Sequence, residues 1–222
     1  MILKNVNSTL KILILLLLST GLCYSADKLQ PVAYNNPDLV VNLGVGLWAW
    51  PLPMDYDGDG DYDLLVSCPD KPYNGTYFFE NTTGDGKSPL FAPAVRLSGS
   101  INNAQISHTD DGPIIMSPAM QWENVVKGQK HKAKKIYPQD NLLRDGKTTR
   151  ANQWKQVDFD GDGDLDLVVG VGDWLQYGWD NAYDSNGDWL RGPLHGYVYL
   201  IENTGTTDTP EYKDPIRLES AG

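Results

Sequence analysis

The sequence predicts an all-β protein built from repeated four-stranded antiparallel sheets. Two stretches of the chain carry the same landmarks in the same order, which indicates an internal repeat. Glycine and proline together make up 36 of the 222 residues, about 16% against a usual share of roughly 12%, so turns are frequent. No segment after the N-terminal leader keeps the apolar spacing of an amphipathic helix, whereas short aromatic and β-branched runs lie between turn residues.

Each copy of the repeat begins with an aspartate run, at residues 55–64 and again at residues 158–167. Each run leads into an apolar stretch that we expect to form a strand. A second expected strand follows, ending in Glu-Asn-Thr at residues 80–82 and 202–204, and a third element follows at residues 91–97 and 212–218. Four matched landmarks in one order are unlikely to arise by chance, so the two stretches are expected to fold alike.

One copy holds about four strands in about 60 residues, which is the size of a β-propeller blade. We therefore expect one blade at residues 40–97, a second at 151–222, and either an insertion or a degenerate blade at 98–150. Because a closed ring needs ~4–8 blades, the sequence predicts an incomplete propeller. The chain is then either a fragment of a longer protein, which we favour, or a unit that assembles with other copies.

The N-terminus has the pattern of a secretory signal peptide. Lys4 and Lys11 precede the apolar residues 12–18, and small residues allow cleavage before Ala26. The apolar stretch is too short to span a membrane, which takes ~20 residues. We assign residues 1–25 to the signal and expect an exported protein, extracellular, at the cell surface or in the periplasm, without a transmembrane span after cleavage. A lipid anchor at Cys23 is the alternative.

The composition argues against a nucleic-acid-binding protein and against a disulfide within the mature chain. The formal net charge of −11 argues against a nucleic-acid binder, which needs a basic face. With residues 1–25 removed, Cys68 is the one cysteine left in the sequence, so no disulfide can form within the chain. Because Cys68 ends an apolar run, we expect it to be a buried strand residue.

The aspartate runs have the spacing of calcium loops. Acidic side chains stand at positions 1, 3, 5, 7 and 9, with glycine at position 6, where the loop must turn sharply. We expect side-chain ligands from positions 1, 3, 5 and 9 and a backbone carbonyl ligand from position 7. The acidic residues are Asp55, Asp57, Asp59, Asp61 and Asp63 in the first run and Asp158, Asp160, Asp162, Asp164 and Asp166 in the second.

Charge repulsion favours a metal site over a solvated acidic turn. A close pair of like charges costs roughly 1 kcal/mol in water and ~4 kcal/mol at an effective dielectric of 20, and each run holds five carboxylates. Magnesium rarely takes an all-protein cage and zinc prefers His or Cys, so Ca²⁺ is the expected ion. An EF-hand would need Glu at position 12, where this chain has Val66 and Val169.

The aspartate runs at 55–64 and 158–167, with the Glu-Asn-Thr elements, resemble the FG-GAP/VCBS repeats, the calcium-binding blades also seen in integrin α-chain propellers. The resemblance implies a calcium-stabilised β-propeller in an exported protein, but no single activity. Members of the family serve as adhesion modules, as carbohydrate-binding parts, or as the body of some polysaccharide lyases. We therefore expect a binding or adhesion module with a carbohydrate or protein ligand; the alternative is part of a carbohydrate-active enzyme such as a polysaccharide lyase.

The second copy carries an aromatic insertion around residues 174–193 that the first copy lacks. Flat aromatic rings among polar residues suit stacking on sugar rings, but they can equally pack the insertion onto its own blade. The candidate ligand-binding residues are Trp174, Tyr177, Trp179 and Trp189, with Tyr183 nearby. The stretch Asp184–Asp188 matches a calcium loop in part.

No motif assigns a catalytic residue. A lyase acting on acidic polysaccharide would need a His or Tyr base and a cation that takes up charge. His195 with Arg191 is the best candidate pair, although their spacing is not diagnostic. The sequence holds no Gly-x-Ser-x-Gly elbow, phosphate-binding glycine loop or His-Glu-x-x-His motif. Residues 127–135 are basic and could bind an anionic polymer or form a solvated loop.

Overall fold

A computed structural model of the chain describes residues 33–35, 44–123, 125, 132–143, 146–178 and 182–220. The expected signal peptide, residues 1–25, lies outside these residues. The described part belongs to one compact unit, Ala33–Gly222. It contains strands and no helix, which confirms the all-β prediction. The described residues accordingly include no apolar helix of membrane-spanning length.

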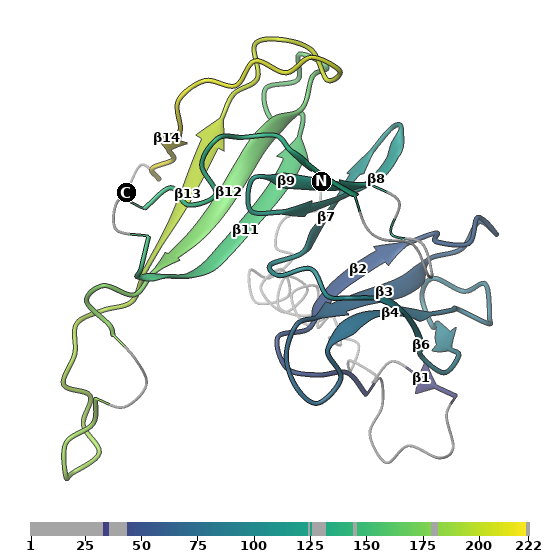
Figure 1. The fold of residues 1–222 in the computed structure, drawn as a ribbon, viewed down its shortest axis with the longest axis horizontal. Helices are drawn as coiled ribbons and strands as arrows, with labels where there is room; N and C mark the ends of the chain where they lie inside the picture. The colour runs from purple at the N-terminus through teal and green to yellow at the C-terminus, as the bar shows by residue number, and fades with distance from the viewer. Residues whose placement is uncertain are drawn as a thin grey trace, which may run out of the picture. The chain divides into compact units, whose positions relative to one another are not determined.

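Three four-stranded antiparallel sheets follow one another along the chain, and none of them closes on itself (Figure 1). The first sheet contains β2 (Trp50–Met54), β3 (Asp63–Cys68), β4 (Gly75–Phe79) and β6 (Val95–Ser98). The second contains β7 (Gln105–Thr109), β8 (Gly112–Ser117), β9 (Met120–Glu123) and β10 (Lys132–Lys135). The third contains β11 (Thr149–Val157), β12 (Asp166–Asp173), β13 (His195–Ile201) and β14 (Ile216–Arg217). In each sheet, every strand pairs with its neighbours in chain order.

Two short strands stand outside these sheets. β1 (Ala33–Tyr34) pairs in parallel with β5 (Leu90–Phe91), which lies between β4 and β6 in the sequence. The segment 98–150, expected to be an insertion or a degenerate unit, contains the complete second sheet although it has no aspartate loop.

The strands after the aspartate loops provide the centre of the first and third sheets. In β3 four consecutive residues, Leu65 to Cys68, are buried, as expected for a strand covered on both faces. Cys68 is fully buried, as predicted. In β12 Leu167, Val169 and Val171 are buried and the residues between them are partly exposed, so mainly one face is covered.

Two apolar clusters join neighbouring sheets. The first places Leu52 and Leu65 of the first sheet against Ile106 and Ile115 of the second. The second places Met116 of β8 against residues of the third sheet, including the fully buried Trp154.

Buried hydrogen bonds reinforce these two contacts. Ser67 Oγ accepts a hydrogen bond from the Ile101 amide at 2.7 Å, and the Gln156 amide donates to Ser107 Oγ at 2.9 Å. The three sheets therefore pack in sequence, each against the next one along the chain.

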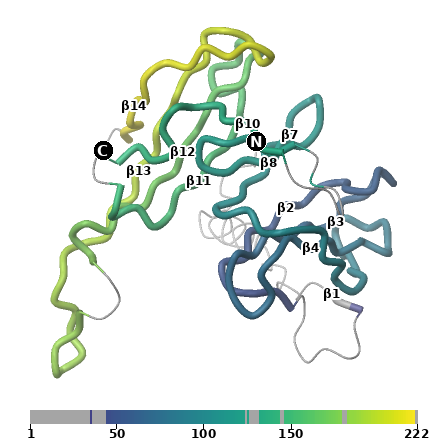
Figure 2. The backbone as a smooth tube through the Cα atoms, viewed as in Figure 1, coloured from purple at the N-terminus to yellow at the C-terminus, as the bar shows by residue number. Residues whose placement is uncertain are grey.

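The connection between β12 and β13 leaves the third sheet as a long excursion (Figure 2). It contains the aromatic insertion. The corresponding connection in the first sheet, between β3 and β4, covers only residues 69–74.

Replacing Trp154 by alanine is expected to destabilise the protein by about 3–5 kcal/mol, because the ring is fully buried between the second and third sheets. Urea denaturation followed by circular dichroism measures this change. Leu175→Ala is the control, because Leu175 is 66% exposed and should shift the free energy of unfolding by less than about 0.5 kcal/mol. Equal losses for the two variants would contradict this packing.

Candidate metal loops and the aromatic insertion

The aspartate at position 1 organises the turn of each loop. Asp55 accepts hydrogen bonds from the amides of Gly58 at 2.8 Å and Gly60 at 3.1 Å. Both glycines have positive φ, 83° and 98°, a conformation that other residues rarely adopt. Asp158 in the second loop accepts the same two bonds from Gly161 and Gly163, at 2.8 and 3.3 Å. The two loops, 103 residues apart, thus share one backbone conformation.

The carboxylates at positions 3 and 5 each accept a hydrogen bond from the amide two residues later. Asp57 accepts from the Asp59 amide at 3.3 Å, and Asp59 accepts from the Asp61 amide at 3.1 Å. The corresponding bonds in the second loop measure 3.2 and 3.0 Å and end on Asp160 and Asp162. These bonds hold alternating carboxylates of the exposed loop in fixed orientations.

The aspartate at position 9 fastens each loop to its sheet. Asp63 is buried, and its two oxygens accept from the amides of Asn81 at 2.9 Å and Tyr56 at 3.1 Å. Asp166 is also buried and accepts in the same way from Asn203 at 2.8 Å and Phe159 at 3.0 Å. The backbone amide of the asparagine in each Glu-Asn-Thr element therefore binds the end of the loop.

The same asparagines connect to the third element of each repeat. Asn81 forms an isolated antiparallel bridge with Phe91, and Asn203 forms one with Tyr212. The Asn203 side-chain oxygen also accepts from the amides of Gly205 and Glu211, at 3.0 and 2.9 Å. Loop, Glu-Asn-Thr element and third element thus form one connected network in each copy.

Two groups of carboxylates within the described residues could hold a metal ion. One oxygen from each of Asp55, Asp57 and Asp63 lies within 4.8 Å of the others. Calcium–oxygen distances are 2.3–2.6 Å, so a single ion can contact all three atoms. In the second loop the group is Asp158, Asp160 and Asp162, so a carboxylate from position 5 takes the place that position 9 has in the first loop. Of the ten aspartates predicted to bind metal, these six converge, whereas Asp59, Asp61, Asp164 and Asp166 lie outside the two groups.

The carboxylates at position 7 are held under electrostatic strain. Asp61 Oδ1 and Asp164 Oδ1 are shielded from solvent and accept no hydrogen bond. Loss of hydration, followed by repulsion from neighbouring carboxylates such as Asp59 and Asp162, raises the pKa of both side chains. Burial also raises the pKa of Asp63, against the opposing effect of its two amide donors. Each loop therefore concentrates negative charge that a cation would neutralise.

Comparison of the chain with protein-family models, with curated proteins and with solved structures finds no match. The assignment of the site therefore depends on the residues and their geometry.

The aromatic residues of the insertion pack mainly against one another. Trp189 stacks on Tyr177 with ring centroids 4.3 Å apart, and Tyr183 meets Trp189 edge-on at 4.9 Å. Trp174 and Tyr177 are also in edge contact, at 4.9 Å. Trp174, Tyr177 and Trp189 are half-buried, whereas Tyr183 is exposed, and Trp179 lies outside the described residues. The rings thus supply the excursion with a small core of its own and leave part of their surface accessible.

The partial calcium motif in the insertion forms a closed turn. Asp184 Oδ1 accepts hydrogen bonds from the amides of Asn186 at 2.8 Å and Asp188 at 2.9 Å, and these bonds lower its pKa. Among the described residues, Asp184 belongs to no group that could hold a metal.

The three histidines of the sequence include His195, the one considered for a lyase. His195 Nε2 lies 3.1 Å from Gln176 Oε1, and the ring is parallel to that of Tyr197. His108 stacks on Tyr62 of the first aspartate loop at 5.8 Å. His131 lies outside the described residues.

Sequence reasoning missed the residues around Arg150. The Arg150 guanidinium carbon lies 4.2 Å from the ring centroid of Trp174 and 5.2 Å from that of Trp48. Trp174, a candidate for stacking on sugar rings, thus also contacts an arginine. The exposed Trp48, close in sequence to the partly buried Trp50, was the available signal, but the arginine comes from a strand about 100 residues away.

Asp166→Ala is expected to destabilise the protein by at least about 2 kcal/mol even in EGTA, because its two charge-assisted bonds to backbone amides do not depend on metal. Asp160→Ala should leave stability in EGTA nearly unchanged, because it removes one exposed acceptor and relieves repulsion. Urea titration of the two variants in EGTA makes the comparison. A larger loss for Asp160→Ala would refute the structural role of position 9.

The stability of the protein should change with pH in opposite directions with and without calcium. In EGTA, the raised pKa values of Asp61, Asp63 and Asp164 mean that the folded state takes up protons more readily than the unfolded state. Stability from these groups therefore increases as the pH falls from about 7 toward the ordinary carboxyl range. In excess calcium, acid displaces the ion and stability decreases over the same range. Melting temperatures at several pH values test this, and parallel curves would contradict it.

Proposed function

We propose that this protein is an exported calcium-binding module built from propeller-type repeats of the FG-GAP/VCBS kind. The observation that carries the proposal is the shared architecture of the two aspartate loops. Both have the same glycine turn, the same amide bonds to carboxylates and the same attachment through a buried aspartate to a Glu-Asn-Thr asparagine. The two loops are far apart in the sequence, and each of them concentrates its own carboxylates at one point.

The donor set favours calcium over other ions. Every candidate side-chain ligand is a carboxylate oxygen, which suits hard cations, and neither converging group contains a histidine or cysteine. Calcium accepts six to eight oxygens in flexible geometry, so carboxylates, backbone carbonyls and water can complete its coordination. Magnesium requires a tighter octahedron and keeps most of its water.

The ion would act mainly on stability. It would neutralise the repulsion within each loop and hold the connection between the first two strands of a sheet, β2 to β3 and β11 to β12. Because the aspartate at position 9 accepts a hydrogen bond from the asparagine of the Glu-Asn-Thr element, an ordered loop also supports that element. An exported protein without an internal disulfide benefits from such a clamp.

The proposed biological role is binding or adhesion. The described residues include both acidic loops and accessible aromatic surfaces, and the histidine suggested for catalysis pairs with a glutamine. A carbohydrate or protein ligand fits this arrangement, and the second copy adds the aromatic excursion that blade formation does not require.

Calcium should raise the stability of the folded protein through both loops. For a dissociation constant of about 10 μM and about 1 mM calcium, each site contributes about 2.7 kcal/mol, so chelation should lower the melting temperature by several degrees at least. Differential scanning calorimetry in calcium, in magnesium and in EGTA measures the effect.

The matched control is the double variant Asp57→Ala with Asp160→Ala, which removes one converging carboxylate from each loop. Its melting temperature should respond much less to calcium than that of the parent protein. If the parent melts at the same temperature in EGTA as in calcium, with metal removal verified by elemental analysis, the proposal fails.

A further inference from the structure

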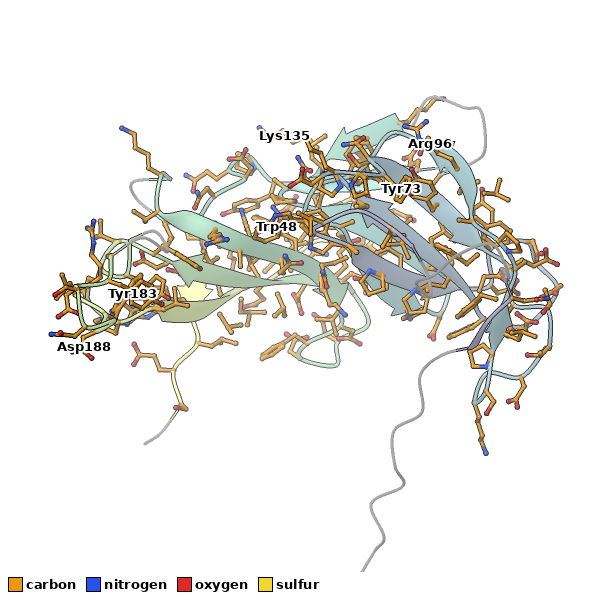
Figure 3. The ribbon with its side chains drawn as sticks, turned by 90° about the horizontal axis from the view of Figure 1, so that it is seen from below. Trp48, Tyr73, Arg96, Lys135, Tyr183 and Asp188 are labelled. Atoms are coloured by element: carbon orange, nitrogen blue, oxygen red, sulfur yellow. The ribbon has the colours of Figure 1, made fainter. Side chains whose placement is uncertain are left out.

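An open groove of about 460 Å³ lies away from both aspartate loops, and its size is within the range of ~300–1,000 Å³ usual for ligand sites. It combines indole rings with amide, carboxylate and guanidinium groups. The residues that matter here are Trp48, Trp50, Asp70, Asn102, Asn103 and Arg150. In Figure 3 Trp48 is well separated from the tip of the excursion, which carries Tyr183 and Asp188.

Backbone strain concentrates at this groove. Three non-glycine residues in the described chain have positive φ, and two of them, Trp48 at 59° and Asn103 at 52°, line the groove. The left-handed conformation is uncommon for a bulky residue, and strained residues cluster at ligand-binding and active sites. Trp48 is also 50% exposed, so burial of its ring does not account for the strain.

Trp48 is held in place by the residues before it. The Leu47 amide donates to the Lys71 carbonyl at 2.8 Å, and Cys68 Sγ lies 3.0 Å from the Leu47 carbonyl oxygen. Gly46 is buried, and a Cβ atom there would overlap the carbonyl oxygen of Asp70. The turn is therefore fixed from two sides before any ligand arrives.

The opposite wall is fixed as well. Ile101 is buried and exchanges hydrogen bonds with Ser67 Oγ through its amide and its carbonyl, at 2.7 and 2.9 Å. Gln153 Nε2 donates to Asn103 Oδ1 at 3.4 Å. Such preorganised walls lower the entropic cost of binding a ligand.

Arg150 determines which ligand charge the groove can accept. Its guanidinium lies over the rings of Trp48 and Trp174, where a cationic ligand would otherwise bind by cation–π contact. A second cation is therefore disfavoured. Asp70 lines the same groove and the chain carries a net charge of −11, so a polyanion is disfavoured too.

We propose that this groove binds uncharged pyranose units of an oligosaccharide. A pyranose presents an apolar ring face that can lie on the part of the Trp48 indole that Arg150 leaves exposed, and its hydroxyl groups can exchange hydrogen bonds with Asn102, Asn103 and Asp70 at the edge. The inference rests on the proposed binding function and gives it a ligand class and a location, distinct from the calcium loops and from the tip of the aromatic insertion.

The test is isothermal titration calorimetry of the calcium-loaded chain with three neutral hexasaccharides: cellohexaose, xylohexaose and mannohexaose. Two comparison probes represent the alternatives, polygalacturonate for a polyanion and decaproline for a peptide. At least one neutral hexasaccharide should bind. Trp48→Gly should weaken that binding at least about tenfold while leaving the melting temperature unchanged or higher, because glycine adopts the left-handed conformation without strain. Asn102→Ala should weaken it to a smaller extent, and Tyr73→Ala, which removes an exposed ring outside the groove, should not change it.

The proposal is overturned if none of the three hexasaccharides binds, if Trp48→Gly and Asn102→Ala keep the parent affinity, or if polygalacturonate or decaproline is the probe that requires Trp48. Should Trp48→Gly also lower the melting temperature, Asn102→Ala decides, because Asn102 is exposed. A parent protein whose melting temperature does not respond to calcium would contradict the proposed function. The binding outcomes above concern the groove alone, so the two failures are distinguishable.

Discussion

Repulsion among the carboxylates of each aspartate loop is the constraint around which the two repeats are built. Five acidic side chains in nine residues resist closing into one turn, and the chain opposes this with backbone amides aimed at the carboxylates. Those amides do not satisfy every oxygen, because one oxygen of Asp61 and one of Asp164 remain shielded and without a hydrogen bond. A bound cation would remove the remaining repulsion, and the position-9 aspartate would transmit that order to the sheet.

Packing between sheets explains how the loops keep their places. Each neighbouring pair of sheets shares an apolar cluster. A buried serine hydroxyl reinforces each contact: Ser67 accepts from Ile101, in the connection to the second sheet, and Ser107 accepts from Gln156 of the third sheet. The segment from Ile101 to Asn103 links the first sheet to the second and also forms one wall of the Trp48 groove. The contact that stabilises the fold therefore also fixes the shape of a candidate binding surface.

Local patterns were sufficient to predict the strands after the aspartate loops, the buried Cys68 and the convergence of acidic residues. The alternation of Asp with Gly fixes the turn within about ten residues, so no distant contact is needed. The same reasoning left the second sheet undecided between an insertion and a degenerate blade, because β7–β10 have no aspartate loop to mark them. It also could not identify the groove, since Trp48 and Arg150 meet only after the first and third sheets are in place, and it could not choose between packing and ligand roles for Trp174.

The number of calcium ions bound per chain tests the central claim most directly. Equilibrium dialysis against radioactive calcium, with the folded protein at known concentration, measures that number and the affinity together. The two equivalent loops predict two bound ions per chain, one ion for Asp57→Ala alone or Asp160→Ala alone, and none of high affinity for the double variant. A parent protein that binds no calcium, or a stoichiometry that these substitutions leave unchanged, would contradict the account.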